Sequence, residues 1–151
     1  MAVCYMKKFK QYFEEKIVLG LIEFFHIDGV GKVAAKLDSG NGAFNVLHGE
    51  DIQLQGNKVF FRTVNGKTLI KDKKDTITIN VGAGNTEDRP VVEFDLKVGD
   101  KEFKGVPFSI GNRSSNIFKI LVGKEFIEQE LDALIDVGQE NIAGSNIEAE
   151  L

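Results

Sequence analysis

Short apolar runs separated by turn sequences cover most of the chain. In Thr76–Val81, Thr and Ile alternate, as in a strand with one buried and one exposed face. Gly56-Asn57 and Gly99-Asp100 each separate two apolar runs, as in a β-hairpin. The predicted strands are Ile17–His26, Val33–Leu37, Ile52–Leu54, Val59–Phe61, Thr76–Val81, Val91–Val98, Glu102–Val106, Phe108–Ile110 and Phe118–Val122. Strands of this length and spacing predict a compact all-β body.

Helical spacing of apolar residues is confined to the two ends of the chain. Aromatic residues recur on one face of a predicted amphipathic helix within residues 1–16. Lys124–Val137 has the same periodicity, and Gly138 is a suitable C-terminal stop. The apolar positions of the two helices are Tyr5, Phe9, Tyr12 and Phe13, and Ile127, Leu131, Leu134 and Ile135.

Charge is unevenly distributed along the chain. Eight acidic residues and no Lys or Arg occur between Glu125 and Leu151, which is typical of a solvated acidic segment. We therefore expect three parts: an N-terminal helical extension (1–16), a β domain (17–137) and an acidic flexible tail (138–151).

The composition is that of one soluble globular domain, since 42% of the 151 residues are hydrophobic and 28% are charged. No apolar run approaches the ~20 residues of a membrane helix. Cys4 is the only cysteine, which excludes an internal disulfide framework and is consistent with a cytoplasmic protein. The lysines between 71 and 74 are interrupted by Asp72, so no basic track for nucleic acid is predicted. With only two histidines, we expect no metal site and no cofactor.

Two glycine-containing motifs imitate nucleotide-binding loops. Gly29–Ala34 fits Gly-x-Gly-x-x-Ala, but the turn sequence from Ser39 leaves no room for the helix that this motif must open. Gly66-Lys67-Thr68 resembles the end of a P-loop, but Phe61 stands where the leading glycine belongs. We interpret both as turns between strands.

Asp38-Ser39-Gly40 is the candidate with the most informative context. It follows the apolar strand Val33–Leu37, and a later apolar strand ends in Ile120–Gly123, just before a predicted helix. An aspartic peptidase needs one strand that delivers Asp to a tight loop and a second, apolar strand that braces the loop. The alternative is an Asx-type turn in which Asp38 has no chemical role.

Six blocks resemble, in order and at matching spacing, the retropepsin-like proteins of the RimK-associated group, often described as ATP-dependent zinc proteases. Ala35-Lys36-Leu37-Asp38-Ser39-Gly40, for example, is similar to the family's Ala-Lys-Ile-Asp-Thr-Gly. The blocks are Val18–Phe24, Ala35–Gly40, Leu47-His48, Arg89–Val92, Asn112–Ser114 and Ile120–Ile127.

The resemblance implies a retropepsin-like closed β-barrel, which is one half of an acid protease, with a short C-terminal helix. It implies a homodimeric aspartic endopeptidase acting on peptides or proteins, because one chain supplies a single Asp38 and catalysis needs two carboxylates. Ser39 would link the two loops across the dimer axis, and Gly40 would allow close backbone approach. Arg113 and the segment Leu121, Val122 and Gly123 would brace the site.

The hairpin Ile52–Arg62 is the candidate flap over the substrate, with Gln53, Leu54, Gln55, Gly56 and Asn57 toward its tip. For His48 and Arg113 the simpler interpretations are a structural hydrogen bond and an ion pair that supports the core strands.

The chain departs from the family pattern next to the predicted catalytic turn. Ser39 replaces Thr, Asn41-Gly42 replaces Ala followed by a basic residue, Phe44-Asn45 replaces Thr-Ser, and Lys124 replaces Arg. Two alternatives stay open. One is a non-catalytic dimer of the same fold that binds peptides or supports assembly. The other is a nucleotide-dependent metalloenzyme, which is suggested by the family's descriptive name alone.

Overall fold

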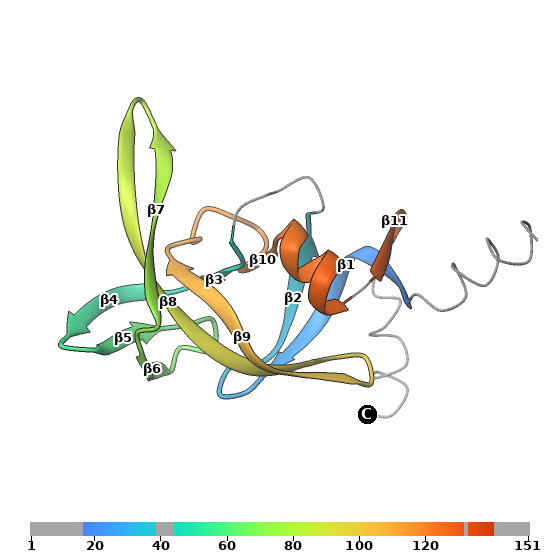
Figure 1. Ribbon diagram of the computed structural model, residues 1–151, viewed down its shortest axis with the longest axis horizontal. Helices are drawn as coiled ribbons and strands as arrows, with labels where there is room; N and C mark the ends of the chain where they lie inside the picture. The colour runs from blue at the N-terminus through green and yellow to red at the C-terminus, as the bar shows by residue number, and fades with distance from the viewer. Residues whose placement is uncertain (1–16, 39–43, 132, 141–151) are drawn as a thin grey trace, which may run out of the picture.

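The computed structural model describes residues 17–38, 44–131 and 133–140. This part of the chain consists mostly of β-strands and contains almost no helix (Figure 1). Its strands are β1 (Ile17–Ile27), β2 (Gly31–Leu37), β3 (Val46–His48), β4 (Glu50–Gln55), β5 (Lys58–Arg62), β6 (Thr68–Asp72), β7 (Asp75–Gly82), β8 (Asn85–Val98), β9 (Lys101–Gly111), β10 (Ile120–Val122) and β11 (Ala133–Glu140). A single-turn π-helix, η1 (Phe126–Leu131), precedes β11.

Six of these strands close into a barrel. Its order is β1-β2-β10-β3-β9-β8, and β8 pairs with β1 to complete the circle. The pairings β2–β10 and β3–β9 are parallel, and the other four are antiparallel. Closure leaves no free edge within the barrel itself. The predicted all-β barrel fold is confirmed.

Aromatic side chains of the barrel strands and of β5 pack against one another in the core. Phe94 of β8 makes edge contacts with Phe108 of β9 and with Phe61 of β5, at ring-centroid distances of 6.0 and 6.5 Å. All three rings are at most 1% exposed. Burial of one such side chain is worth about 1.5–3 kcal/mol, so these contacts contribute substantially to the stability of the fold.

A second sheet and a long hairpin extend from the barrel. The sheet has the order β4-β5-β6, and the hairpin consists of β7 and the first part of β8. The turn predicted at Gly56-Asn57 connects β4 to β5, and Gly56 has a φ of 58°, which favours glycine. The β8–β9 hairpin is also confirmed, although β9 includes the stretch Phe108–Ile110 that the sequence predicted as a separate strand.

The C-terminal helix is shorter than the sequence predicts. The structure has only η1 and the two residues before it in helical conformation, and 133–140 form strand β11. Ile127 and Leu131 are buried as their periodicity predicts. The prediction of helix to Val137 is wrong because β11 pairs in parallel with β1, and these backbone hydrogen bonds outweigh the local preference for helix. The strand also passes the expected domain boundary at residue 137.

The predicted N-terminal helix (1–16) and the end of the acidic tail (141–151) lie outside the described residues. Within the described part, no helix has the length and apolar character required to span a membrane.

Candidate active site

Asp38 lies where two parallel strands of the barrel end together. It directly follows β2, whose last residue, Leu37, pairs with Val122 at the end of β10. The backbone N–H of Asp38 donates a hydrogen bond to the carbonyl oxygen of Val122, at an N···O distance of 3.0 Å. Asp38 itself is half-buried. The structure therefore brings Asp38 beside the segment Leu121–Gly123, as expected, whereas Ser39 and Gly40 lie outside the described residues.

Asn45, seven residues after Asp38, is hydrogen-bonded to the same segment, Leu121–Gly123. Its side-chain oxygen accepts a hydrogen bond from the backbone N–H of Gly123 at 2.9 Å, and its side-chain nitrogen donates to the carbonyl of Pro107 at 3.1 Å. Its own carbonyl accepts from both the backbone N–H and the hydroxyl of Ser109, at 2.8 and 3.1 Å. In the sequence, Asn45 stands out only as a departure from the family pattern, because its partners Pro107 and Gly123 lie far away along the chain.

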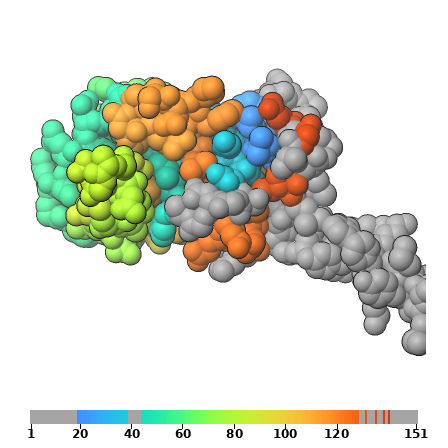
Figure 2. Space-filling model, turned by 90° about the horizontal axis from the view of Figure 1, so that it is seen from above, coloured from blue at the N-terminus to red at the C-terminus, as the bar shows by residue number. Residues whose placement is uncertain are grey.

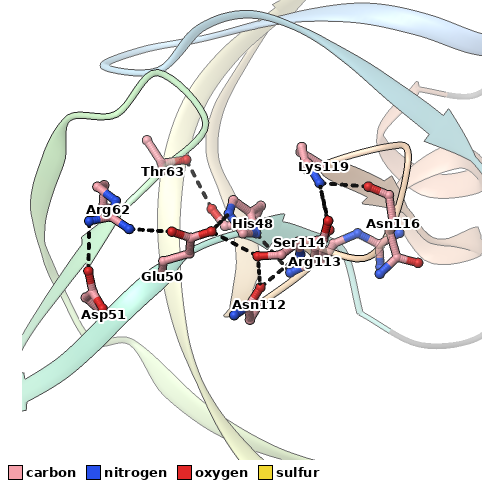
Figure 3. A network of polar contacts seen from close by, with 10 residues as sticks. All are labelled: His48, Glu50, Asp51, Arg62, Thr63, Asn112, Arg113, Ser114, Asn116 and Lys119. Atoms are coloured by element: carbon pink, nitrogen blue, oxygen red, sulfur yellow. Dashed lines mark hydrogen bonds and ion pairs between the residues drawn. The ribbon is translucent and has the colours of Figure 1, made fainter.

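His48 lies beside the beginning of β10, at the other end of this strand from Asp38, within a network of polar contacts (Figure 3). Its Nδ1 accepts a hydrogen bond from the backbone N–H of Arg113 at 2.9 Å, so the other ring nitrogen, Nε2, is the one available to donate. Nε2 lies 3.2 Å from Oε1 of Glu50. His48 is thus a buried structural hydrogen bonder, which agrees with the simpler interpretation of this residue.

Glu50 is the centre of this network. Its carboxylate accepts hydrogen bonds from Arg62 and from the hydroxyl of Ser114, the latter at 2.9 Å. These interactions, the Arg62 hydrogen bond foremost, lower the pKa of Glu50 from 4.5 to about 2. Arg62 also pairs with Asp51 at 2.9 Å. The network connects the second sheet to the β9–β10 loop (Figure 3).

Arg113 stabilises the β9–β10 loop. Its Nε donates to the carbonyl of Phe118 at 3.0 Å, and its own carbonyl accepts from Nζ of Lys119 at 2.9 Å. Burial, together with the nearby charge of Arg89, lowers the pKa of Arg113. The expected bracing by Arg113 is therefore local to this loop, and among the described residues it forms no ion pair of the kind the simpler interpretation expected.

The two protruding hairpins differ in their position relative to Asp38. The β4–β5 hairpin, which contains the candidate flap residues Gln53, Leu54, Gln55, Gly56 and Asn57, lies with β6 at one side of the molecule (Figure 1). The β7–β8 hairpin instead rises on the side where β2 ends. Seen from above (Figure 2), this hairpin, the β9–β10 loop and part of β2 are visible on one face.

No group of three or more His, Cys, Asp or Glu among the described residues is arranged to hold a metal ion. Gly29 and Gly66 both have positive φ and lie in turns, and Gly31–Ala34 of the first motif belong to strand β2, so neither motif opens a helix. Two open depressions of about 390 and 410 Å³ share Asp28 and Asp95 in their linings. Both lie near the β1–β2 turn, at the other end of β2 from Asp38.

Comparison with known proteins identifies the fold. No protein-family model matches the chain, and no curated protein matches it. Among solved structures, it is similar to Lpg0085 from Legionella pneumophila, described as a protein of unknown function (DUF785). The TM-score is 0.66 with 21% sequence identity, and the match covers 84% of this chain and 98% of the other. At this identity, the likeness establishes a shared fold.

Proposed function

We propose that the chain is one subunit of a homodimeric aspartic endopeptidase. The observation that carries the proposal is the position of Asp38 at the joint end of β2 and β10, with its backbone bonded to Val122. Asp38 belongs to the only Asp-Ser-Gly sequence of the chain. A second copy of the chain would therefore supply the facing Asp38.

The paired carboxylates would share one proton, because two close negative charges repel each other. The ionised carboxylate takes a proton from a water molecule, whose oxygen attacks the peptide carbonyl carbon, while the protonated carboxyl donates to the carbonyl oxygen. As the C–N bond breaks, the carboxyl that took the water proton donates it to the leaving nitrogen. The other carboxylate takes a hydroxyl proton from the tetrahedral intermediate, which restores the singly protonated pair. Asp38 is thus both general base and general acid within the pair. The site needs neither a metal nor ATP.

We further propose that the β7–β8 hairpin, in place of the β4–β5 hairpin, covers the bound peptide. Its support is that the β7–β8 hairpin rises on the side of the molecule where β2 ends, whereas the β4–β5 hairpin extends to one side (Figure 1). The two hairpins offer a matched comparison, because Val81 near one tip is 52% exposed and Leu54 near the other is 55% exposed. Val81→Asp should lower kcat/KM for a peptide at least several-fold, whereas Leu54→Asp should leave it near the wild-type value. A larger loss of kcat/KM in Leu54→Asp than in Val81→Asp would show instead that the β4–β5 hairpin is the flap.

The decisive experiment is cleavage of a peptide library by the wild type and by Asp38→Asn, over a range of pH. Asp38→Asn should abolish cleavage and keep the fold, since it removes both carboxylates of the dimer. Asp100→Asn, in the exposed β8–β9 turn, is the control and should be fully active. Sedimentation should give about twice the 16.7 kDa of one chain, and chelator or ATP should leave the rate unchanged.

Other results of these experiments would favour a different function or mechanism. A dimer that cleaves nothing at any pH would favour a non-catalytic peptide-binding or assembly module. A monomer with full activity would exclude the shared carboxylate pair. Loss of cleavage with chelator, restored by zinc, would favour the metalloenzyme.

We place the activity in the cytoplasm, on the support of the single cysteine, Cys4.

A further inference from the structure

One peptide group connects Asp38 to Asn45. The carbonyl oxygen of Val122 accepts the hydrogen bond from the backbone N–H of Asp38, at 3.0 Å. The N–H of Gly123, which belongs to the same peptide group, donates to Oδ1 of Asn45 at 2.9 Å. The chain therefore leaves this peptide group at Asp38 and returns to it seven residues later, at Asn45.

The orientation of the Asn45 amide is determined by its partners. Gly123 presents an N–H and Pro107 presents a carbonyl oxygen, so reversing the amide would place donor against donor and acceptor against acceptor. Asn45 is only 6% exposed, which leaves little water to replace a lost partner. Two further bonds from Ser109 hold its backbone on β9.

We propose that Asn45 is a positioning residue for Asp38. By holding the N–H of Gly123, Asn45 fixes the plane of the Val122–Gly123 peptide group, and the carbonyl of that group fixes the backbone of Asp38. The two hydrogen bonds are in series through one polarisable amide, so each strengthens the other. The effect on rate rests on the proposed function, but the effect on the Asp38 backbone does not.

Amide hydrogen exchange measured by NMR tests the proposal without any need for activity. Asn45→Ala should reduce the protection of both the Gly123 and the Asp38 N–H by about tenfold, the usual order for one lost hydrogen bond. The N–H of His48, which is bonded to Lys119 at the other end of β10, should change much less. Loss of protection at Gly123 alone, with Asp38 unchanged, would overturn the proposal.

Two further variants separate positioning from general stability. Asn45→Asp keeps an acceptor for Gly123 and loses the donor to Pro107, so it should protect Asp38 better than Asn45→Ala does. Equal loss in the two variants would contradict the role of Oδ1. Thr63→Val removes one buried hydrogen bond, to the carbonyl of His48, and is the control for a stability loss away from Asp38. It should not selectively expose the Asp38 N–H.

Kinetics adds a readout if the wild type cleaves peptides. Asn45→Ala should then lower kcat about tenfold or more with KM nearly unchanged, because positioning affects the reacting group more than substrate binding. An unchanged kcat would overturn the proposal. If the wild type cleaves nothing, the peptidase proposal fails, and the exchange experiment still decides whether Asn45 positions Asp38.

Discussion

The two ends of strand β10 are stabilised by different kinds of interaction. At the carboxyl end, neutral groups meet in the interior: the amide of Asn45, the hydroxyl of Ser109 and the backbone of Gly123. At the amino end, charged groups meet near the surface, where Glu50 binds Arg62. The first set adjoins the backbone of Asp38, which is hydrogen-bonded to Val122, and the second joins the second sheet to the β9–β10 loop.

The difference lies in how much solvent competes with each set. Buried neutral hydrogen bonds have no water to replace them, so they fix geometry well and are costly to break. The side chains of Glu50 and Arg62 are 32% and 45% exposed, so water and salt screen their attraction. We therefore expect the charged end of β10 to depend more on apolar packing than on its ion pairs.

The largest effect is expected at Gly49, which directly precedes Glu50. A Cβ at this position would lie 2.4 Å from Cγ2 of the buried Ile110 and 3.3 Å from the ring of Phe61. Gly49→Ala should lower the free energy of unfolding by about 2–3 kcal/mol through overpacking. Denaturant melts would measure it, and Ile110→Ala should relieve part of the cost in the double variant. If the losses in unfolding free energy of the two single variants simply add in the double variant, the contact with Ile110 is not the cause.

An intermediate effect is expected at Ser109, at the buried neutral end. Ser109→Ala removes the hydroxyl donor to Asn45 but leaves the backbone N–H of residue 109 bonded to the same carbonyl. The unfolding free energy should fall by about 1 kcal/mol, as for one neutral hydrogen bond. Added salt should leave this difference unchanged, because no charge is involved. A salt-dependent difference would contradict the contrast between the two ends.

The smallest effect is expected for Glu50→Gln. The pKa of Glu50 in the folded protein, about 2, is below its ordinary value of 4.5, so its carboxylate stabilises the fold above pH 4.5. That stabilisation is lost as the pH falls from 4.5 toward 2. Thermal melts should show the wild type slightly more stable than Glu50→Gln at neutral pH, with the difference vanishing in acid and shrinking in salt. A difference larger than that of Ser109→Ala would reverse our ranking.

Most strands were predictable because alternation of apolar and polar residues is a local signal. Thr76–Val81 and Val33–Leu37 both lie within strands of the structure. The segment after Leu131 was not predictable, because its apolar spacing suits a helix. It forms a strand only because the first part of β1, before the residues that pair with β8, is available for pairing. The same limit applies to the site: the neighbourhood of Asp38 and β10 was expected, whereas the role of Asn45 was not.

Sequence alone determined most of the strand and turn pattern and the single Asp38 after an apolar strand. These depend on neighbouring residues and on hydrophobicity, which the sequence states directly. Tertiary structure decided which strands pair, which hairpin rises on the side where β2 ends (Figure 1), and what Asn45 binds. Asn45 and Gly123 are 78 positions apart, and His48 and Arg113 are 65 apart. Such contacts form only when the barrel closes, because its closure brings these distant segments within hydrogen-bonding distance.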